Sequence, residues 1–313
     1  MNTPTIHVPV MPEESIAALE PGPGKTIIDG TFGGGGHSSL LAASVLPGGR
    51  VIGLDRDEGA VERSQQIIER LAVHAPQAAA AITVYCASYH QIDRALAAEG
   101  LDGVDGILLD LGLSSDQLAD RSRGFSFSVE GPLDLRFDTS SGEPASRLLK
   151  RWNEKQIADV IYRYGEERFS RRIARRIVQA RQEGQAIETT TDLAELVRRC
   201  VPRSKNHDID PATRTFQALR IAANDELQIL EQALSRAADW LNPDGRIAVI
   251  SFHSLEDRIV KNQFRDCPRL EVLTRKPLRP SDTETQHNPR ARSAKLRIAR
   301  RRRDEEMPAV QPY

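Results

Sequence analysis

The chain has 313 residues, enough for one large domain or two ordinary ones with a substantial hydrophobic core. Hydrophobic residues make up 39% and charged residues 28% of the chain, a composition that excludes wholesale disorder. Because 43 Lys and Arg residues nearly balance 44 Asp and Glu residues, the net charge is −1, and no global field draws the protein to nucleic acid or to an anionic membrane. A local patch must bind any such partner.

The cysteines, the histidines and the N-terminus bear on the compartment of the protein. Cys86, Cys200 and Cys267 are odd in number and lack CxxC spacing, which argues against a disulfide framework and a structural zinc site. The histidines show no metal-ligand spacing, so we expect no metal centre. The chain has no leader-like start and no run approaching the roughly 18 apolar residues of a membrane span. We therefore expect a soluble, cytoplasmic protein.

Short apolar runs alternate with helical stretches between residues 26 and 110, which is typical of a parallel sheet covered by helices. The predicted strands are TIIDG (26–30), RVIGLD (50–55), AITVYC (81–86) and VDGILLD (104–110), and the predicted helices are 38–45, 58–73 and 89–98. GPGKT (22–26) resembles the end of a phosphate-binding P-loop. It lacks the first glycine of that motif and precedes its strand, so we interpret it as a turn.

Four consecutive glycines, Gly33 to Gly36, join the first predicted strand to the first predicted helix. An open α/β sheet binds its ligand at this point, and glycines let backbone N–H groups approach the ligand. A merely flexible turn is the alternative, but it does not explain four glycines in this position. A dinucleotide fingerprint would need a third glycine where the chain has Ser38.

Carboxylates end the first two predicted strands. Asp29 would repel a pyrophosphate, whereas it would attract the ammonium and sulfonium groups of S-adenosylmethionine. Asp55 can accept hydrogen bonds from both hydroxyls of a ribose, which indicates a nucleoside without choosing its class; a solvated strand-end carboxylate is the alternative. Together the two residues favour S-adenosylmethionine over a dinucleotide.

Asp110 ends the fourth predicted strand, where the reactive end of the cofactor should lie, and Ser114 and Ser115 follow it. The chain lacks the Pro-Pro-aromatic sequence that amino methyltransferases often carry here, so we expect these three residues to supply the polar contacts to the target. Tyr89 either packs on adenine or fills space, and His37 either acts as a base or caps the following helix.

Helical and loop patterns replace the strand pattern between about residues 116 and 215. The segment RGFSFSVEGPLDLRF is typical of a loop, whereas EKQIADVIYRYG (154–165) and EERFSRRIARRIVQAR (166–181) predict amphipathic helices. Strand patterns return at 246–252, 269–273 and 293–299. We therefore predict one α/β domain, residues 1–115 and 216–313, that is interrupted by a helical domain at 116–215.

The segment 166–181 combines an apolar face with a basic one. Phe169, Ile173 and Ile177 repeat every four residues and predict the buried face. The arginines of the segment are Arg168, Arg171, Arg172, Arg175, Arg176 and Arg181. A second basic cluster spans 288–303. Such clusters suit phosphate backbones, and the alternative is a solvated surface on which arginines pair with nearby glutamates.

Eight stretches of the chain resemble the MraW family, also called RsmH, of bacterial ribosomal RNA small subunit methyltransferases. They are DGTFGGGGHS, DGILLDLGLSSDQL, RGFSF, GPLDLRFD, YGEERFSRRIARRI, DPATRTFQALRIAANDEL, SFHSLEDRIVK and NPRARSAKLR, in order from about His7 to Ile298. The resemblance implies a Rossmann-like methyltransferase sheet with an inserted all-helical domain that recognises the substrate. It also implies methyl transfer from S-adenosylmethionine to the exocyclic N4 of a cytidine in the decoding region of 16S rRNA, within the small ribosomal subunit.

The resemblance further implies roles for individual residues. Cofactor contacts are implied for Gly35, Gly36, His37, Asp55, Tyr89, Asp110 and Gln117. Tyr89 stands where the family often has Phe. As the catalytic acceptor against N4–H we expect Asp110 first and Ser114 second. Two other classes of function stay open: a nicotinamide-dependent oxidoreductase, which Asp29 and Ser38 disfavour, and an rRNA-binding assembly factor that has kept the fold without turnover.

Overall fold

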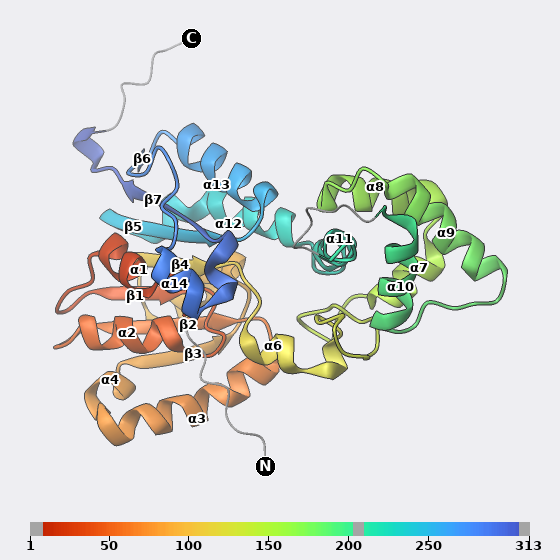
Figure 1. Ribbon diagram of the computed structural model, residues 1–313. Helices are drawn as coiled ribbons and strands as arrows, with labels where there is room; N and C mark the ends of the chain where they lie inside the picture. The colour runs from red at the N-terminus through yellow and green to blue at the C-terminus, as the bar shows by residue number, and fades with distance from the viewer. Residues whose placement is uncertain (1–8, 203–209, 307–313) are drawn as a thin grey trace, which may run out of the picture. The chain divides into compact units, whose positions relative to one another are not determined.

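The computed structural model describes residues 9–202 and 210–306. The chain forms two compact units, Met1–Ser114 with Leu227–Tyr313, and Ser115–Glu226 (Figure 1). The second unit is therefore inserted in the sequence of the first. None of the helices in the described ranges is both long enough and apolar enough to span a membrane.

The first unit is built on a seven-stranded sheet with the strand order β3-β2-β1-β4-β5-β7-β6 (Figure 1). Strands β1 to β5 are parallel, and β7 runs antiparallel to both of its neighbours. The strands are β1 Thr26–Asp29, β2 Arg50–Asp55, β3 Ile82–Cys86, β4 Val104–Asp110, β5 Leu241–Ser251, β6 Leu270–Val272 and β7 Lys295–Arg301. The order reverses direction between β1 and β4, the kind of switch point at which open α/β sheets bind ligands.

Helices cover both faces of this sheet. The α-helices of the first unit are α1 Pro12–Leu19, α2 Gly36–Ser44, α3 Glu58–His74, α4 Pro76–Ala80, α5 Ile92–Glu99, α12 Glu226–Trp240, α13 Ser254–Asp266 and α14 Asp282–His287. Short 3₁₀ turns are η1 Tyr89–Gln91, η3 Pro289–Ser293 and η4 Asp304–Glu306. Ile27 packs with α1, α2 and α4 on one face, whereas Ile28 packs with α5, α12 and α13 on the other. This alternation follows from the two-residue period of a strand.

All seven predicted strands are present, with ends that differ by a few residues. The largest difference is at β5, which begins at Leu241 and not at residue 246. The first predicted helix begins two residues early, at Gly36, so the last glycine of the loop already belongs to α2. GPGKT contains a turn at residues 23 and 24, as predicted.

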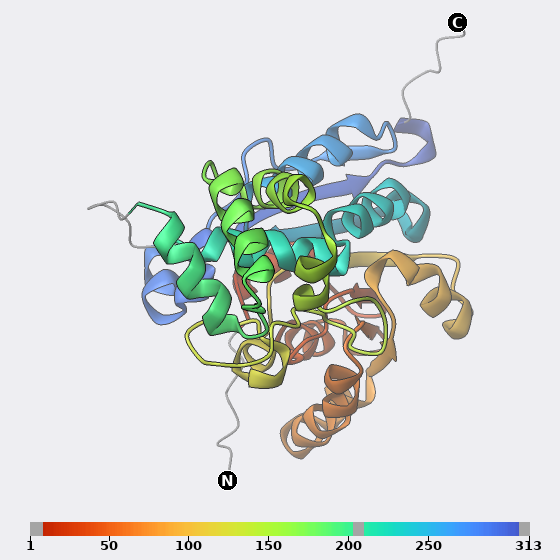
Figure 2. The ribbon, with the colours of Figure 1, turned by 90° about the vertical axis from the view of Figure 1, so that its right-hand side faces the viewer.

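The second unit consists of helices and loops. Its helices are α6 Ser115–Ala119, η2 Arg121–Arg123, α7 Ala145–Arg151, α8 Glu154–Gly165, α9 Ser170–Gln182, α10 Thr190–Cys200 and α11 Thr213–Asn224. Among its described residues a single β-bridge, Pro132 to Thr189, stands in place of strands. Helices α8 and α9 pack side by side (Figures 1 and 2). Helix α11 also packs on α8, so the second unit extends to Glu226 and not to the predicted boundary at 215.

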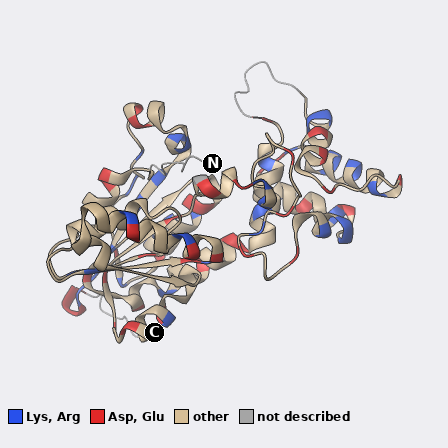
Figure 3. Cartoon of the chain, turned by 90° about the horizontal axis from the view of Figure 1, so that it is seen from below, with Lys and Arg blue, Asp and Glu red and all other residues tan. Residues whose placement is uncertain are grey.

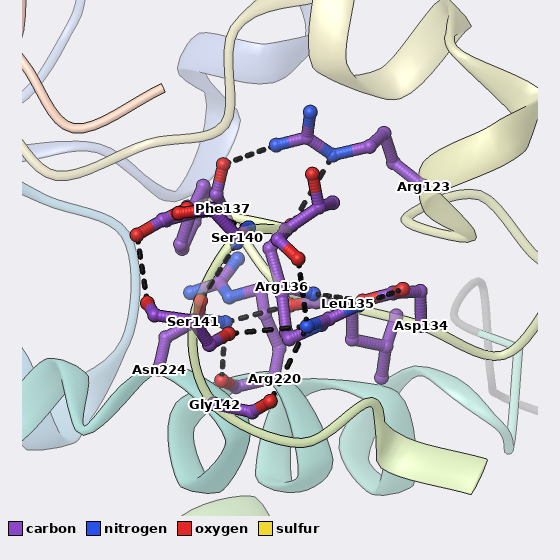
Figure 4. A network of polar contacts seen from close by, with 12 residues as sticks. Arg123, Asp134, Leu135, Arg136, Phe137, Ser140, Ser141, Gly142, Arg220 and Asn224 are labelled. Atoms are coloured by element: carbon purple, nitrogen blue, oxygen red, sulfur yellow. Dashed lines mark hydrogen bonds and ion pairs between the residues drawn. The ribbon is translucent and has the colours of Figure 1, made fainter. Parts of the chain in front are cut away.

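The loop between η2 and α7 is held by two polar side chains (Figure 4). Arg136 forms a bidentate ion pair with Asp134 at 2.7 and 2.8 Å and donates to three backbone carbonyls of the loop. Asn224, at the end of α11, accepts from the Phe137 amide at 2.8 Å and donates to the Leu135 carbonyl at 2.6 Å. Leu135 has a φ of 66°, which is costly for a non-glycine residue, and these bonds hold it there.

Candidate active site

Three carboxylates mark one edge of the sheet. Asp29, Asp55 and Asp110 are the last residues of β1, β2 and β4, and these strands are adjacent in the order β2-β1-β4. Because parallel strands end at the same edge, the three side chains lie along one line, with the glycine loop following the middle strand. The structure therefore brings together the residues that the sequence indicated separately.

The glycine loop adopts a backbone that side chains would disturb. Gly33 and Gly35 have φ values of 50° and 70°, in the left-handed region that favours glycine. A Cβ atom on Gly35 would lie 2.9 Å from the ring of Phe32, and one on Gly36 would lie 3.1 Å from Pro9. The loop thus packs closely against Phe32 and Pro9, and side chains at these glycines would not fit without shifts.

Asp55 is held by backbone donors and still has acceptor capacity. Its Oδ2 accepts from the Gly33 amide and its Oδ1 from the Asp57 amide, both at 2.9 Å. Each oxygen keeps a second lone pair. Burial raises the pKa of Asp55 to about 6, against the opposing effect of the two amides. The residue is therefore ionised at neutral pH and can accept two further hydrogen bonds.

Asp29 is almost completely buried, with 1% of its surface exposed. The Ser38 hydroxyl donates to its Oδ2 at 2.7 Å, and the Thr31 amide donates to its Oδ1 at 3.2 Å. Burial raises the pKa of Asp29, whereas the neighbouring His37 lowers it. The sequence analysis treated Ser38 only as a missing glycine, but its hydroxyl is the partner of this carboxylate. Asp29 is therefore a buried side chain and not an exposed ligand.

His37 lies in the first turn of α2 and is buried. Its Nε2 is 2.9 Å from the Val10 carbonyl oxygen, and because that oxygen can only accept, Nε2 carries the proton. Its Nδ1 is 3.9 Å from Asp110 Oδ2. The predicted alternative in which His37 caps α2 is wrong, because Gly35 is the N-cap and the ring turns towards Val10. In the neutral ring Nδ1 is an acceptor, so a donor bound between it and Asp110 would contact both groups.

Asp110 is connected to both sides of the site. Its backbone amide donates to the Thr31 hydroxyl at 2.7 Å, and its Oδ1 accepts a longer bond, 3.4 Å, from the Gly112 amide. Burial raises the pKa of Asp110, and Glu256 adds to this effect, whereas His37 and Arg290 lower it. Thr31 therefore joins the ends of β1 and β4, with its amide on Asp29 and its hydroxyl on Asp110.

The end of β5 completes the edge beside Asp110, and the sequence analysis missed it. Glu256 is buried at the start of α13 and accepts from the amides of Phe252 and His253 at 2.8 and 3.3 Å. A Cβ atom on Gly112 would lie 2.7 Å from the Phe252 ring. The available signal was a glutamate three residues after His253 at a strand-to-helix junction, the spacing of a capping box.

The other predicted site residues are distributed between the two units. Tyr89 begins η1 and packs against the end of β1, since a Cβ atom on Gly30 would lie 2.9 Å from its Cβ. Ser114 is buried, and its Cβ would lie 3.6 Å from a Cβ atom on Gly33, so it adjoins the glycine loop. Gln117 lies on α6 in the second unit, and its cofactor contact stays a prediction.

The arginines of α9 are only partly paired. Arg181 donates to backbone carbonyls at the end of α7. Arg175 and Arg176 form ion pairs at 3.7 and 3.6 Å with glutamates of α8 and of the turn after α9. Arg171 and Arg172 form no hydrogen bond or ion pair within the described part of the chain. The basic face of α9 therefore has positive charges that are not neutralised by ion pairs in that part of the chain and can bind an anionic partner.

The basic C-terminal cluster is mostly engaged within the first unit. Arg300 pairs with Glu271 at 2.7 Å, with Glu306 at 2.8 Å and with Asp244. Arg303 pairs with Asp244 at 2.5 Å. These contacts join β7 to its neighbours at the sheet edge. Acids of the same unit thus neutralise Arg300 and Arg303, whereas Arg301 donates to the Leu241 carbonyl, and RNA binding by this cluster stays a prediction.

Comparison with known proteins identifies the family. Residues 4–302 match the model of the MraW methylase family. The ribosomal RNA small subunit methyltransferase H of Rhodopirellula baltica is 54% identical over 304 residues, 95% of this chain and 92% of that one. The proteins of the same name from Sorangium cellulosum and Brevibacillus brevis are 49% and 43% identical, and each match covers 94% of this chain and 90% and 97% of the relative. The predicted Rossmann-like methyltransferase fold is confirmed, and the chain belongs to the MraW methylase family.

Proposed function

We propose that this protein transfers a methyl group from S-adenosylmethionine to the exocyclic N4 of a cytidine in the decoding region of 16S rRNA. Membership of the methylase family supports the reaction, and the names of the relatives support the small-subunit rRNA as substrate. The observation that carries the proposal is the row of carboxylates at the ends of β1, β2 and β4 around the glycine loop.

The residues at this edge fit the methyl donor. Asp55 offers one free lone pair on each oxygen, as two ribose hydroxyls require. The pKa values of Asp29 and Asp110 are raised by burial, so a cation bound nearby would relieve a charge that the fold leaves poorly solvated. The same charge would repel a pyrophosphate, which disfavours a dinucleotide.

Each predicted contact has a distinct task in this proposal. The backbone of Gly35 and Gly36 and the residue His37 would hold the amino-acid end, Asp55 the ribose and the ring of Tyr89 the adenine. Asp110 and Gln117 would complete the site. When bound, S-adenosylmethionine supplies an electrophilic methyl group on a sulfonium.

The protein's own task in catalysis is to activate a weak nucleophile. The N4 lone pair of cytosine is delocalised into the ring, so an acceptor against N4–H favours the charge that develops on nitrogen. Asp110 is the first candidate, since Thr31 and Gly112 orient its backbone and carboxylate, and Ser114 is the second. Nδ1 of His37, 3.9 Å away, is a second acceptor on the same side. The cytidine must be unpaired or flipped for its N4 to reach these groups.

The test uses isotopically labelled S-adenosylmethionine with small ribosomal subunits that lack the modification and, in parallel, with protein-free rRNA. Digestion to nucleosides should reveal labelled N4-methylcytidine. Label on another nucleoside would contradict the proposed target. No label in either sample, with cofactor binding intact, would favour an assembly factor that has kept the fold.

A further inference from the structure

Tyr162 has a large aromatic side chain that is exposed to solvent. It lies on α8 with 63% of its surface exposed. The buried residues of α8 include Ile157, Ala158 and Ile161. Within the described residues, the Tyr162 side chain takes part in no hydrogen bond and no ring contact. Core packing therefore does not account for an aromatic ring at this position.

Helices α8 and α9 run antiparallel beside each other, and two contacts define their register. Arg175 of α9 pairs with Glu154 at the start of α8, at 3.7 Å. Arg171, one turn before Arg175 in α9, lies near Asp159, which is about one turn after Glu154 in α8. The hydrogen bond from Lys155 lowers the pKa of Asp159, and the nearby charge of Arg171 lowers it further. The two helices are therefore antiparallel, and the short turn that joins them lies beyond Asp159 and Arg171.

The same register brings Tyr162 among arginines. Tyr162 and Arg163 follow Asp159 by three and four residues, so they are its neighbours on the next turn of α8. Arg168 lies in the turn between the two helices, three residues before Arg171 and two before α9 begins at Ser170. Because Tyr162 and Arg163 lie in the last turn of α8 and Arg168 in the turn that follows, all three lie at the same end of the helix pair.

The charges around Tyr162 are available to a partner. Arg163, Arg168 and Arg171 are exposed and form no ion pair with any residue that the structure describes. Asp159 is already bonded to Lys155 at 2.8 Å. The guanidinium of Arg168 lies 4.7 Å above the Phe169 ring, which fixes its place without neutralising it. Figure 3 shows several blue segments of Lys and Arg on the helices of this unit, between tan and red ones.

We propose that Tyr162, with Arg163, Arg168 and Arg171, forms a platform that binds an unpaired segment of rRNA. The Tyr162 ring stacks on one base, and the arginines bind the phosphates on either side. An unpaired segment fits better than a duplex, because the bases of a duplex are already stacked and expose no face to the ring. This inference rests on the proposed function, since it takes RNA as the substrate.

The test replaces Tyr162 in the full-length protein by Ala, Leu and Phe and measures affinity for protein-free 16S rRNA and for unmodified small subunits. Tyr162→Ala and Tyr162→Leu should weaken binding about tenfold, because both remove the aromatic face, whereas Tyr162→Phe should bind like the wild type. The affinity for S-adenosylhomocysteine and kcat at saturating subunits should not change. Val73→Ala, at an apolar side chain with 73% exposure in the first unit, is the matched control.

A second measurement addresses the arginines. Arg163→Gln and Arg171→Gln should each reduce the slope of log affinity against log salt by about 0.7, the value for one phosphate contact on a single strand. Arg199→Gln on α10 is the control, because Arg199 is also exposed but pairs with Glu195 at 3.2 Å. It should leave the slope unchanged.

Either of two results would overturn the platform. One is wild-type affinity in Tyr162→Ala and Tyr162→Leu. The other is weaker binding to subunits with unchanged binding to protein-free rRNA, which would assign the surface to a ribosomal protein. The proposed function can fail independently of the platform. If the labelled product is not N4-methylcytidine but the Tyr162 variants still bind rRNA weakly, the proposed target is wrong and the platform stands.

Discussion

At the residue scale, three aspartates at one sheet edge differ through the groups that contact their oxygens. Asp55 is held by two amides and keeps a lone pair on each oxygen. Asp29 is buried and accepts a hydrogen bond from Ser38. Asp110 faces the His37 ring across 3.9 Å. Burial and partners therefore differ at each strand end, and on this basis we propose Asp55 as the ribose acceptor and Asp110 as the catalytic acceptor.

The raised pKa of Asp55 predicts a pH dependence of nucleoside binding. Since this pKa is about 6 in the free protein, the carboxylate that accepts both ribose hydroxyls is mostly protonated at pH 5 and ionised at pH 7.5. We expect the affinity for S-adenosylhomocysteine to rise about tenfold over this range and then level off. Titration calorimetry at several pH values measures it. Asp55→Asn should bind weakly with a flat profile, and a flat wild-type profile would contradict the assignment.

The catalytic role of Asp110 can be separated from its role in cofactor binding. Asp110→Asn keeps the size of the side chain but cannot take a proton, so we expect the single-turnover methyl transfer rate at saturating cofactor to fall about 100-fold. Quenched-flow measurement of labelled rRNA gives this rate. A variant that binds the cofactor poorly yet transfers at the normal rate would sink the catalytic role. Ser114→Ala is the comparison. A larger loss of rate in Ser114→Ala than in Asp110→Asn would make Ser114 the first candidate for the catalytic acceptor.

At the element scale, the helical period of α9 places its apolar and basic side chains on different sides of the helix. Ile173 and Ile177 are buried, as the four-residue spacing predicted, whereas Phe169 is the N-cap and is only half-buried. Arg171 and Arg175 lie on the side of α8, near its acids. Arg172 and Arg176 lie towards α10, where their charges act on the Cys200 thiol. The basic surface of α9 therefore consists of two rows, separated by the helical period.

The second row predicts a change in RNA affinity. Charge reversal at Arg172 and Arg176 should weaken rRNA binding and flatten its salt dependence, because fewer counterions are released. The ion pair of Arg176 with Glu183, at 3.6 Å on the surface, contributes little to stability, so the fold should persist. Filter binding over a salt series measures the effect. Arg265→Glu on the first unit is the control, and wild-type binding by the double variant would argue against RNA contact by this row.

At the scale of the whole molecule, the proposed tasks divide between the units. The strand-end carboxylates and the glycine loop belong to the first unit, whereas α9 and Tyr162 belong to the second. Gln117 of α6 is the predicted cofactor contact outside the first unit. We propose that the sheet holds the cofactor and that the inserted helices hold the rRNA.

Hydrogen exchange can test this division in one experiment. S-Adenosylhomocysteine should slow amide exchange in the glycine loop and at the ends of β1, β2 and β4, because these amides lie at the proposed site. In the second unit it should protect α6, through Gln117, and leave α8 to α11 unchanged. An rRNA fragment should protect α8 and α9. Unchanged exchange in α6 would show that Gln117 makes no contact, and protection of α8 to α11 by the cofactor alone would contradict the division.

Much of the fold and part of the site could be predicted because they depend on local patterns. Alternating strands and helices indicated the sheet, and parallel strands must end at one edge, so Asp29, Asp55 and Asp110 could be grouped from their positions alone. The glycine loop followed from its place after the first strand. The resemblance of eight motifs then supplied the family, which the comparisons confirmed.

The partners of these side chains could not be predicted, because they come from distant segments. The Val10 carbonyl that orients His37 lies 27 residues away along the chain, and the Asp244 that neutralises Arg300 lies 56 residues away. Helix α11 joins the second unit by packing on α8, although its own sequence suits either unit. Periodicity is a property of neighbouring residues and is written in the sequence; hydrogen-bond partners and burial arise only when remote segments pack, and here they determine which charges are already paired and which are left for a ligand.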